Sequence, residues 1–342
     1  GACGDVSAVA YYAGRRLREA LDVPVGMLIC CVGGTEISNW ISRSALTALP
    51  EGRAALAEFE KSIEGISDEA FARANADYQA RVEAWVERAE ALRREKGDVR
   101  GVEIAEKVGD FPWPPPPGPG MMRRPGNLFR TMTDRVTPYG ARGLFWYQGE
   151  SDSGKAQAYE ALFAALIGDW RRAFESEDLC VIAAQLPGYA SDPAAEDWSA
   201  IRTAQRRVCE RVNGCALACL LDCGESKDLH PWDKRLPGRR MADLALEHAY
   251  GMAVDAEAPR LESTSRDGDD LRLRFTKPLA PLRGTGRSLR VNGETVEARV
   301  TEGELAIAAK EPVHIEYAME NDPAACLFSE DGLPAFPFEA DA

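Results

Sequence analysis

Short apolar runs alternate with amphipathic helical stretches in the middle of this chain. Between residues 143 and 250, the runs GLFWY, VIAAQL and ALACLL have the character of buried strands. Each is followed by a stretch with apolar side chains at helical spacing. Such alternation is typical of a parallel sheet with helices packed on both faces. The sequence therefore predicts an α/β fold.

Two further elements are expected before this region. Residues 5–21 carry apolar side chains at helical spacing and predict a helix. Residues 23–34, VPVGMLICCVGG, form an apolar run that predicts a buried strand ending in a glycine turn.

Residues 51–120 differ in composition from the rest and are interpreted as an insertion between core strands. The stretch from 51 to 96 is rich in Ala, Glu and Arg, and Ser67 before Asp68 and Glu69 is a helix-start signal. A 4-3-4-3 apolar stripe follows, made of Tyr78, Val82, Trp85, Ala89 and Leu92. The run FPWPPPPGPG predicts an extended return path after a helical hairpin. Two roles for this insertion, a lid over a pocket and a dimer contact, are equally compatible with the sequence.

Beyond residue 251 the pattern changes to period-two alternation, which predicts a small antiparallel β unit with a turn at Asn292-Gly293. We therefore expect an α/β domain over 1–250, interrupted by 51–120, and a β unit with a C-terminal tail packing back on the core over 251–342.

Charge and hydropathy exclude several partners. The formal net charge of −14 argues against nucleic acid and anionic lipid, because phosphate binding requires clustered Lys and Arg. The longest apolar runs are too short to span a bilayer. We expect neither a nucleic-acid nor a membrane partner.

The nine cysteines are interpreted as small buried side chains rather than a disulfide framework, since their number is odd and Cys30 and Cys31 are adjacent in an apolar run. Cys215, Cys219 and Cys223 recur every fourth residue without a neighbouring His. On an extended strand such side chains do not converge on one ion, so no metal site is expected.

Three polar loops follow predicted strands, at 31–40, 146–152 and 222–234. In open parallel sheets, ligands bind beyond the carboxyl ends of the strands. The third loop contains His230 two residues after Asp228, a pairing that favours a general base. His248, on a predicted helix, and His314, in the β unit, have no comparable setting.

Five segments, in order, resemble blocks of the sialate O-acetylesterase family of SGNH-type hydrolases. They are DVSAVAYYAGRRLREAL, VPVGMLICCVGGTEISNW, RGLFWYQGESD, DLHPWDKRLPGRRMADLAL and VHIEYAMENDPAACLFSEDGLPAFPF. The resemblance spans most of the chain apart from 51–120. It implies an SGNH-hydrolase-like, flavodoxin-like parallel sheet with helices on both faces. It also implies a cofactor-free esterase acting on acetylated sialic acid or a related acetylated sugar, in a periplasmic or secreted location.

The resemblance assigns catalytic roles to the His230 segment. His230 would take the proton of a nucleophilic serine and return it to the leaving sugar hydroxyl. Asp228 would orient the imidazole and stabilise its charged form. The spacing is Asp-x-His here, with Lys227 three residues before the His, so Glu225 and a main-chain carbonyl remain alternatives to the favoured Asp228.

The same resemblance implies an oxyanion hole. A main-chain N–H of Gly33 or Gly34 and the side-chain amide of Gln148 would face the developing negative charge. Three further residues are expected to contact substrate or to brace these loops: Glu150, Thr35 and Trp40.

The nucleophile is not found. The family carries its serine in a Gly-Gln-Ser-Asn-like block upstream of the first helix, and no such block occurs in these residues. Ser7, in the sequence Gly-Asp-Val-Ser, is preceded by only six residues, too few for the strand that a nucleophile turn must follow. We therefore expect the serine on a complementary N-terminal fragment or subunit, or to have been lost.

Three other functions compete with a sialate esterase. An acetylxylan-type esterase would use the same chemistry on another sugar. A catalytically inactive homologue that binds carbohydrate would keep the pocket without the serine. A glycosidase using Glu150 and Asp152 is the weakest, because residues two apart on one loop rarely reach the carboxyl separation of roughly 5–9 Å that glycoside hydrolysis requires.

Overall fold

The structure is a computed structural model that describes residues 6–284, 286–309 and 312–342. The chain divides into two compact units, one made of Gly1–Ile37 with Val136–Ala342 and the other of Ser38–Arg135. None of the helices in the described ranges has the length and apolar character needed to cross a membrane.

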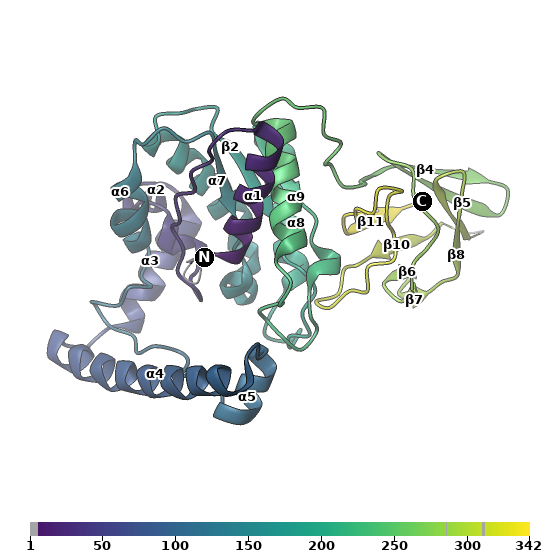
Figure 1. Cartoon of the computed structure of the whole chain (residues 1–342). Coiled ribbons are helices and arrows are strands. Elements are labelled where there is room, and N and C mark those ends of the chain that lie inside the picture. The colour runs from purple at the N-terminus through teal and green to yellow at the C-terminus, as the bar shows by residue number, and fades with distance from the viewer. Residues whose placement is uncertain (1–5, 285, 310–311) are drawn as a thin grey trace. The chain divides into compact units, whose positions relative to one another are not determined.

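The first unit contains a parallel sheet, in agreement with the predicted α/β fold, and its strand β2 is labelled in Figure 1. Within the described part of the chain it has three strands in the order β1 (Gly143–Trp146), β2 (Cys180–Ala184) and β3 (Cys215–Ala218). All five residues of β2 are buried, as expected of a central strand with helices on both faces.

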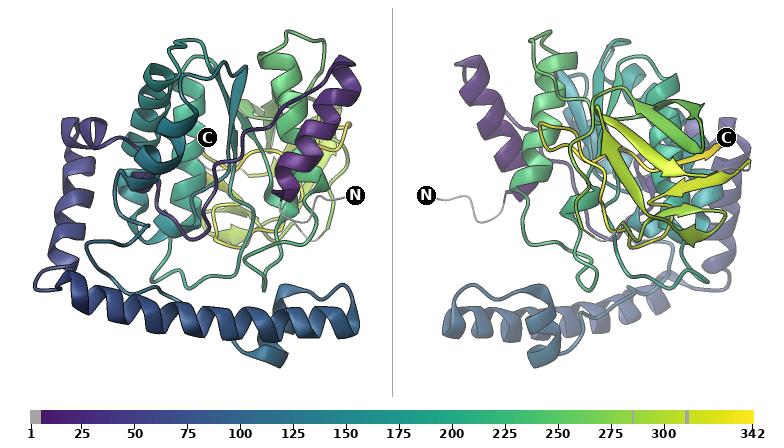
Figure 2. Two further views of the ribbon diagram at one scale, coloured as in Figure 1. Left: turned by 60° about the vertical axis from the view of Figure 1, so that its left-hand side comes forward. Right: turned by 90° about the vertical axis from the view of Figure 1, so that its right-hand side faces the viewer.

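Helices cover both faces of this sheet (Figure 2). On one face, Ile182 and Ala216 share an apolar cluster with α1 (Ala8–Leu21) and α9 (Arg235–His248). On the other, the ring of Trp146 stacks on Phe163 of α7 (Ala156–Ala173), with the centroids 6.4 Å apart. The fourth helix, α8 (Trp198–Arg211), packs beside α7.

Gly238 sets how closely α9 approaches α1. A Cβ at this position would lie 2.7 Å from the Cβ of Tyr12 and 2.8 Å from the main-chain oxygen of Val9. Any larger residue would push the two helices apart.

The strand predicted over residues 23–34 is wrong. The segment is described without a gap and runs without strand pairing, and Val23, Leu28 and Ile29 are 50%, 50% and 39% exposed. An apolar run indicates burial, but it becomes a strand only where a neighbouring strand satisfies its N–H and C=O groups. In the described structure β1, at the sheet edge, pairs only with β2.

The second unit is helical, as the composition of 51–96 predicts. Ser67 caps the long helix α4, its Oγ accepting from the N–H of Ala70 at 3.1 Å. The stripe on α4 packs against the following helix, with Ala89 in one cluster with Val99 and Ile104. Residues 111–117 form neither helix nor strand. The α-helices are α2 (Arg43–Ala48), α3 (Pro50–Ser62), α4 (Asp68–Lys96) and α5 (Gly101–Val108).

The C-terminal region forms two four-stranded antiparallel sheets, ordered β11-β10-β6-β7 and β4-β5-β9-β8. Asn292 and Gly293 have φ values of 50° and 82° and join β6 to β7, so the predicted turn is confirmed. The strands are β4 (Leu261–Asp267), β5 (Asp270–Phe275), β6 (Leu289–Val291), β7 (Glu294–Thr295), β8 (Ala298–Thr301), β9 (Glu304–Ala308), β10 (His314–Tyr317) and β11 (Phe338–Asp341).

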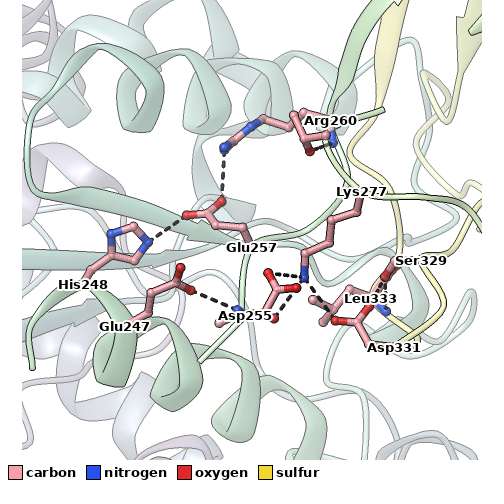
Figure 3. A network of polar contacts seen from close by, with 11 residues as sticks. Glu247, His248, Asp255, Glu257, Arg260, Lys277, Ser329, Asp331 and Leu333 are labelled. Atoms are coloured by element: carbon pink, nitrogen blue, oxygen red, sulfur yellow. Dashed lines mark hydrogen bonds and ion pairs between the residues drawn. The ribbon is translucent and has the colours of Figure 1, made fainter. Parts of the chain in front are cut away.

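A polar network holds the connection from α9 to the β sheets (Figure 3). His248 Nε2 lies 2.8 Å from Glu257 Oε1, and Lys277 Nζ lies 2.8 Å from Asp255 and 3.1 Å from Asp331. The bond to Glu257 raises the pKa of His248, because it favours the charged ring.

Arg202 of α8 anchors the segment that follows β10. Its guanidinium is fully buried and donates to the main-chain oxygens of Ala318 (3.4 Å), Asn321 (3.4 Å) and Glu320. Burial lowers the pKa of Arg202 to about 10, so the side chain still carries its charge at neutral pH. One buried cation therefore satisfies three carbonyls of the C-terminal region.

We expect Arg202→Met to lower the free energy of unfolding by about 2–4 kcal/mol, because it leaves buried carbonyls without donors. Urea denaturation measures the change. The control is Arg206→Met on the same helix, which removes an i,i+4 pair with Glu210 and should cost less than about 1 kcal/mol. Equal losses for the two variants would contradict the anchoring role.

Candidate active site

Three loops of the first unit contain the proposed base, its carboxylate partner and the proposed oxyanion donors. We call them the Gly33 loop (32–37), the Gln148 loop (147–152) and the His230 loop (224–234). The Gln148 loop directly follows β1, and the His230 loop follows β3 after a short 3-10 turn, Leu221–Cys223. Because the sheet is parallel, both loops leave it at the same edge.

Gln148 joins its loop to the Gly33 loop. Its side chain is buried, and its amide nitrogen donates to the main-chain oxygen of Thr35 (2.9 Å) and to Asp152 Oδ2 (2.5 Å). The hydroxyl of Tyr159 lies 3.2 Å from the amide oxygen. Both amide hydrogens are thus engaged within the protein. In this structure the side chain of Gln148 therefore braces the two loops. Its oxyanion role stays a prediction, because an amide hydrogen binds an oxyanion only when one of these two hydrogen bonds is broken.

Asp152 completes this link, a role that the sequence did not reveal. Its buried carboxylate also accepts from the main-chain N–H of Ile37 at 2.9 Å. Burial raises the pKa of Asp152 to about 7, against the opposing effect of the bond from Gln148. The only sequence signal was an Asp four residues after the Gln, in QGESD.

The glycine of the QGESD segment, Gly149, lies where the structure leaves no room for a side chain. Its φ is +154°, and a Cβ there would lie 2.9 Å from Ile201 Cγ2 and 3.1 Å from Leu186 Cδ1. The chain can turn directly off the strand against α8 only without a side chain at this position.

The predicted oxyanion glycines lie immediately before the braced residue Thr35. Gly34 has a φ of +63°, and a Cβ added at Gly33 would meet no atom within 4 Å. The Oγ1 of Thr35 donates to the main-chain oxygen of Val32 at 2.8 Å, so Thr35 braces its own loop. The open space at Gly33 is compatible with an approaching substrate, and the oxyanion role of the two glycines remains a prediction.

Trp40 is 3% exposed at the end of the 3-10 helix Ile37–Trp40. A direct contact between this indole and a sugar would require the ring to leave its buried position, so its substrate-binding role stays a prediction.

The His230 loop is shaped by carboxylates that bind its backbone. Asp228 Oδ1 accepts from the main-chain N–H of His230 at 2.9 Å, and Glu225 Oε1 accepts from that of Trp232 at 2.9 Å. Asp228 is buried, whereas His230 is exposed. Asp228 therefore positions His230 through the main chain in this structure, and a bond from Asp228 to the imidazole stays a prediction.

Glu150, on the Gln148 loop, interacts electrostatically with two residues of the His230 loop. Burial raises the pKa of Glu150, and the nearby charges of His230 and Lys234 oppose that rise. Lys234 extends toward the same place, with Nζ 5.8 Å from the centroid of the Tyr147 ring. Burial lowers the pKa of Lys234, while Glu150 acts to raise it. Glu150 is thus a largely buried carboxyl group on which the charges of two basic residues act.

Lys234 was missed as a site residue. The signal was present in the segment DLHPWDK, where the lysine follows His230 by four residues. Sequence spacing alone does not show that the charges of Lys234 and Glu150 interact in the folded chain.

Ser7 has a structural role. Its Oγ accepts from the N–H of Ala10 at 3.4 Å and caps α1. Gly4 and Asp5 of the Gly-Asp-Val-Ser match lie outside the described residues.

A potential group of metal ligands lies on the C-terminal strands rather than in these loops. Among the described residues, His314, Glu316 and Glu339 have ligand atoms within 4.8 Å of one another. They come from β10 and β11.

Comparison with known proteins identifies a family whose model matches part of this chain. Residues 118–237, which include the Gln148 and His230 loops, match the family model described as carbohydrate esterase, sialic acid-specific acetylesterase. The chain is related to the sialate O-acetylesterase family.

Two relatives show how far this family relationship extends. Sialate O-acetylesterase of Rattus norvegicus is 28% identical over 177 residues, which cover 50% of this chain and 26% of the rat protein. A carbohydrate acetylesterase from Xanthomonas citri matches the structure with a TM-score of 0.70 at 22% identity, over 99% of this chain and 66% of that one. The chain thus spans a quarter of the length of the rat relative and 66% of the X. citri chain, and the latter likeness establishes the fold.

The raised pKa of Asp152 leads to a prediction about stability and pH. In the unfolded chain an Asp ionises near its ordinary pKa of 3.8, whereas folded Asp152 stays protonated up to about pH 7. Between these values the folded state binds more protons, so the free energy of unfolding should fall as pH rises. One pKa unit is worth about 1.4 kcal/mol, so the loss should reach a few kcal/mol at most.

Asp152→Asn should flatten this dependence, because Asn keeps an oxygen for the N–H of Ile37 and does not titrate. Denaturant unfolding of both proteins from pH 4 to pH 8 measures the slopes. Asp192→Asn, in an exposed loop, is the control and should keep the wild-type slope. An Asp152→Asn protein with that same slope would show that the carboxyl does not titrate in this range.

Proposed function

We propose that the protein is a carbohydrate O-acetylesterase that hydrolyses acetyl esters of sialic acid or of a related acetylated sugar. One observation carries the proposal: the Gln148 loop and the His230 loop leave the same edge of the parallel sheet, and Gln148 and Asp152 tie the Gln148 loop to the Gly33 loop. The charge of His230 also acts to lower the pKa of Glu150 on the Gln148 loop. A base, a carboxylate and two exposed glycines therefore belong to one connected set of loops. The family relationship supports acetyl esters of sugars as the substrate class.

In this proposal His230 is the general base. Its exposed position lets it take a proton from a serine hydroxyl and later return it to the leaving sugar oxygen. The buried carboxylate of Asp228 keeps the loop in place through the main-chain N–H of His230. Glu150, close to both His230 and Lys234, would stabilise the imidazolium formed after proton transfer.

The oxyanion would be bound at the Gly33 loop. The acetyl carbonyl develops negative charge when the serine attacks, and main-chain N–H groups at Gly33 and Gly34 are the proposed donors. A donor of this kind is worth roughly 3 kcal/mol of transition-state stabilisation. Gln148 and Asp152 would hold this loop rigid by their bonds to Thr35 and Ile37.

We further propose that the nucleophilic serine lies on a segment outside these 342 residues, either a preceding part of the same protein or a bound fragment. Two features support this. Val23, Leu28 and Ile29 lie exposed in an extended segment, and β1 pairs on one side only within the described structure. An added strand beside β1 would satisfy its free main-chain groups.

The decisive experiment expresses the natural reading frame, including any codons upstream of Gly1, and assays hydrolysis of p-nitrophenyl acetate. We expect activity in that protein and a loss of about 10²–10⁴-fold in kcat for His230→Ala, the range typical of a general base. His314→Ala, an exposed His on β10, is the matched control and should retain activity.

A serine-directed fluorophosphonate, followed by peptide mass spectrometry, locates the nucleophile. The proposal requires the label on a serine outside residues 1–342. A label on Ser7 would overturn the placement of the serine, and equal rates for His230→Ala and the parent protein would remove His230 from the mechanism.

A catalytically inactive carbohydrate-binding homologue remains the second candidate, favoured by the capping role of Ser7. Low and equal rates in all variants, together with binding of an acetylated sialic acid, would support it. Comparing acetylated sialic acid with acetylated xylan as substrates separates the sialate-type from the acetylxylan-type enzyme.

A further inference from the structure

Two cysteine thiols lie unusually close together at the junction of α8 and β3. The Sγ atoms of Cys209 and Cys215 are 2.9 Å apart, and both residues are partly buried. A disulfide has an S–S distance of about 2.05 Å. The two sulfurs therefore need to approach by less than 1 Å, which small rotations of two side chains provide.

The backbone on both sides of this pair is held in place. Cys209 lies in the last turn of α8, and Cys215 is the first residue of β3. Gly214, with a φ of +69°, allows the tight turn between them, and the N–H of Cys215 donates to the oxygen of Val212 at 3.2 Å. Arg171 of α7 donates to the oxygen of Asn213 at 2.7 Å.

These contacts keep the sulfurs close without the help of a covalent bond. A disulfide in this position would cross-link the end of a core helix to the start of a core strand. The 2.9 Å separation of the sulfurs favours its formation, whereas many introduced disulfides fail because they distort the native geometry.

We propose that Cys209 and Cys215 form a reversible disulfide when the protein meets a thiol-oxidising environment. This goes beyond the proposed esterase activity and does not depend on it. One intramolecular pair is also compatible with an odd number of cysteines. The odd number argues only against a framework in which every cysteine is paired within the chain.

The oxidation balances with a low-molecular-weight disulfide, such as oxidised glutathione, as the oxidant. One cysteine thiolate attacks the oxidant, forms a mixed disulfide and releases one thiol. The second cysteine then attacks the mixed disulfide, forming the Cys209–Cys215 bond and releasing a second thiol. Two electrons and two protons pass from the cysteine pair to the oxidant.

The thiol environment sets the rate of this step. Cys209 has a raised pKa, first because of its hydrogen bond with Cys215 and then because of burial. Since the thiolate is the reactive form, oxidation should be slow at pH 7 and faster at pH 9.

Cys180 is the natural competitor for Cys215. It begins the neighbouring strand β2, one residue before Val181, which pairs with Cys215. The charge of Cys215 contributes to the raised pKa of Cys180, about 11, after burial as the main cause. A test must therefore distinguish the 209–215 pair from a 180–215 pair.

The experiment equilibrates the full 342-residue chain in oxidised and in reduced glutathione buffers, traps free thiols with N-ethylmaleimide and digests with trypsin. Cleavage after Arg207, Arg211 and Lys227 places Cys209 in VCER and Cys215 in VNGCALACLLDCGESK. We expect these two peptides to be linked in the oxidised sample, with fragmentation assigning the bond to Cys215, and separate in the reduced sample.

Stability provides a second readout. The oxidised protein should melt about 3–6 °C higher than the reduced one, as expected for a short cross-linked loop in a unit of this size. Cys209→Ala and Cys215→Ala should abolish this difference, and Cys180→Ala should retain it. Fully alkylated Cys209 and Cys215 in the oxidised buffer, or a bond from Cys215 to Cys180, would overturn the proposal.

Discussion

The buried side chain of Gln148 is the contact on which the candidate site depends. It ends a core strand and donates to a carbonyl of a loop more than a hundred residues earlier in the chain. Asp152 adds a second bond to that loop through Ile37. A buried polar network of this kind specifies one arrangement, because each group left without its partner would carry a desolvation cost.

The residues of the QGESD segment have different roles in this network. Gln148 and Asp152 hold two loops together, whereas the charges of His230 and Lys234 act on Glu150. Gly149 permits the turn between Gln148 and Glu150. Glu150 is itself largely buried, so the charge of the candidate base acts on a desolvated carboxyl group.

The parallel sheet ends at β1 within the described structure, and an exposed apolar segment precedes the Gly33 loop. Apolar side chains in an extended segment without a neighbouring strand are characteristic of a sheet that another segment completes. In the proposed mechanism, one additional strand would both pair with the free side of β1 and carry the serine. The helical unit, Ser38–Arg135, has its own apolar contacts along α4 and α5.

The sequence alone determined the elements whose cause is local. The amphipathic helices, the cap at Ser67, the hairpin at Asn292-Gly293 and the apolar runs of β1, β2 and β3 follow from side-chain spacing and turn chemistry. The family blocks also singled out the loops that carry His230, Gln148 and Gly33.

Only the tertiary structure decided which partner each polar group has. The carboxylate of Asp228 accepts from a main-chain N–H, and the amide of Gln148 donates to the main-chain oxygen of Thr35. Lys234 interacts electrostatically with Glu150. The tertiary structure also left residues 23–34 without strand pairing, although their apolar character predicts a strand. The physical reason is the same in each case: hydrogen bonds and strand pairing join segments far apart in the chain, and spacing within one segment carries no information about the other.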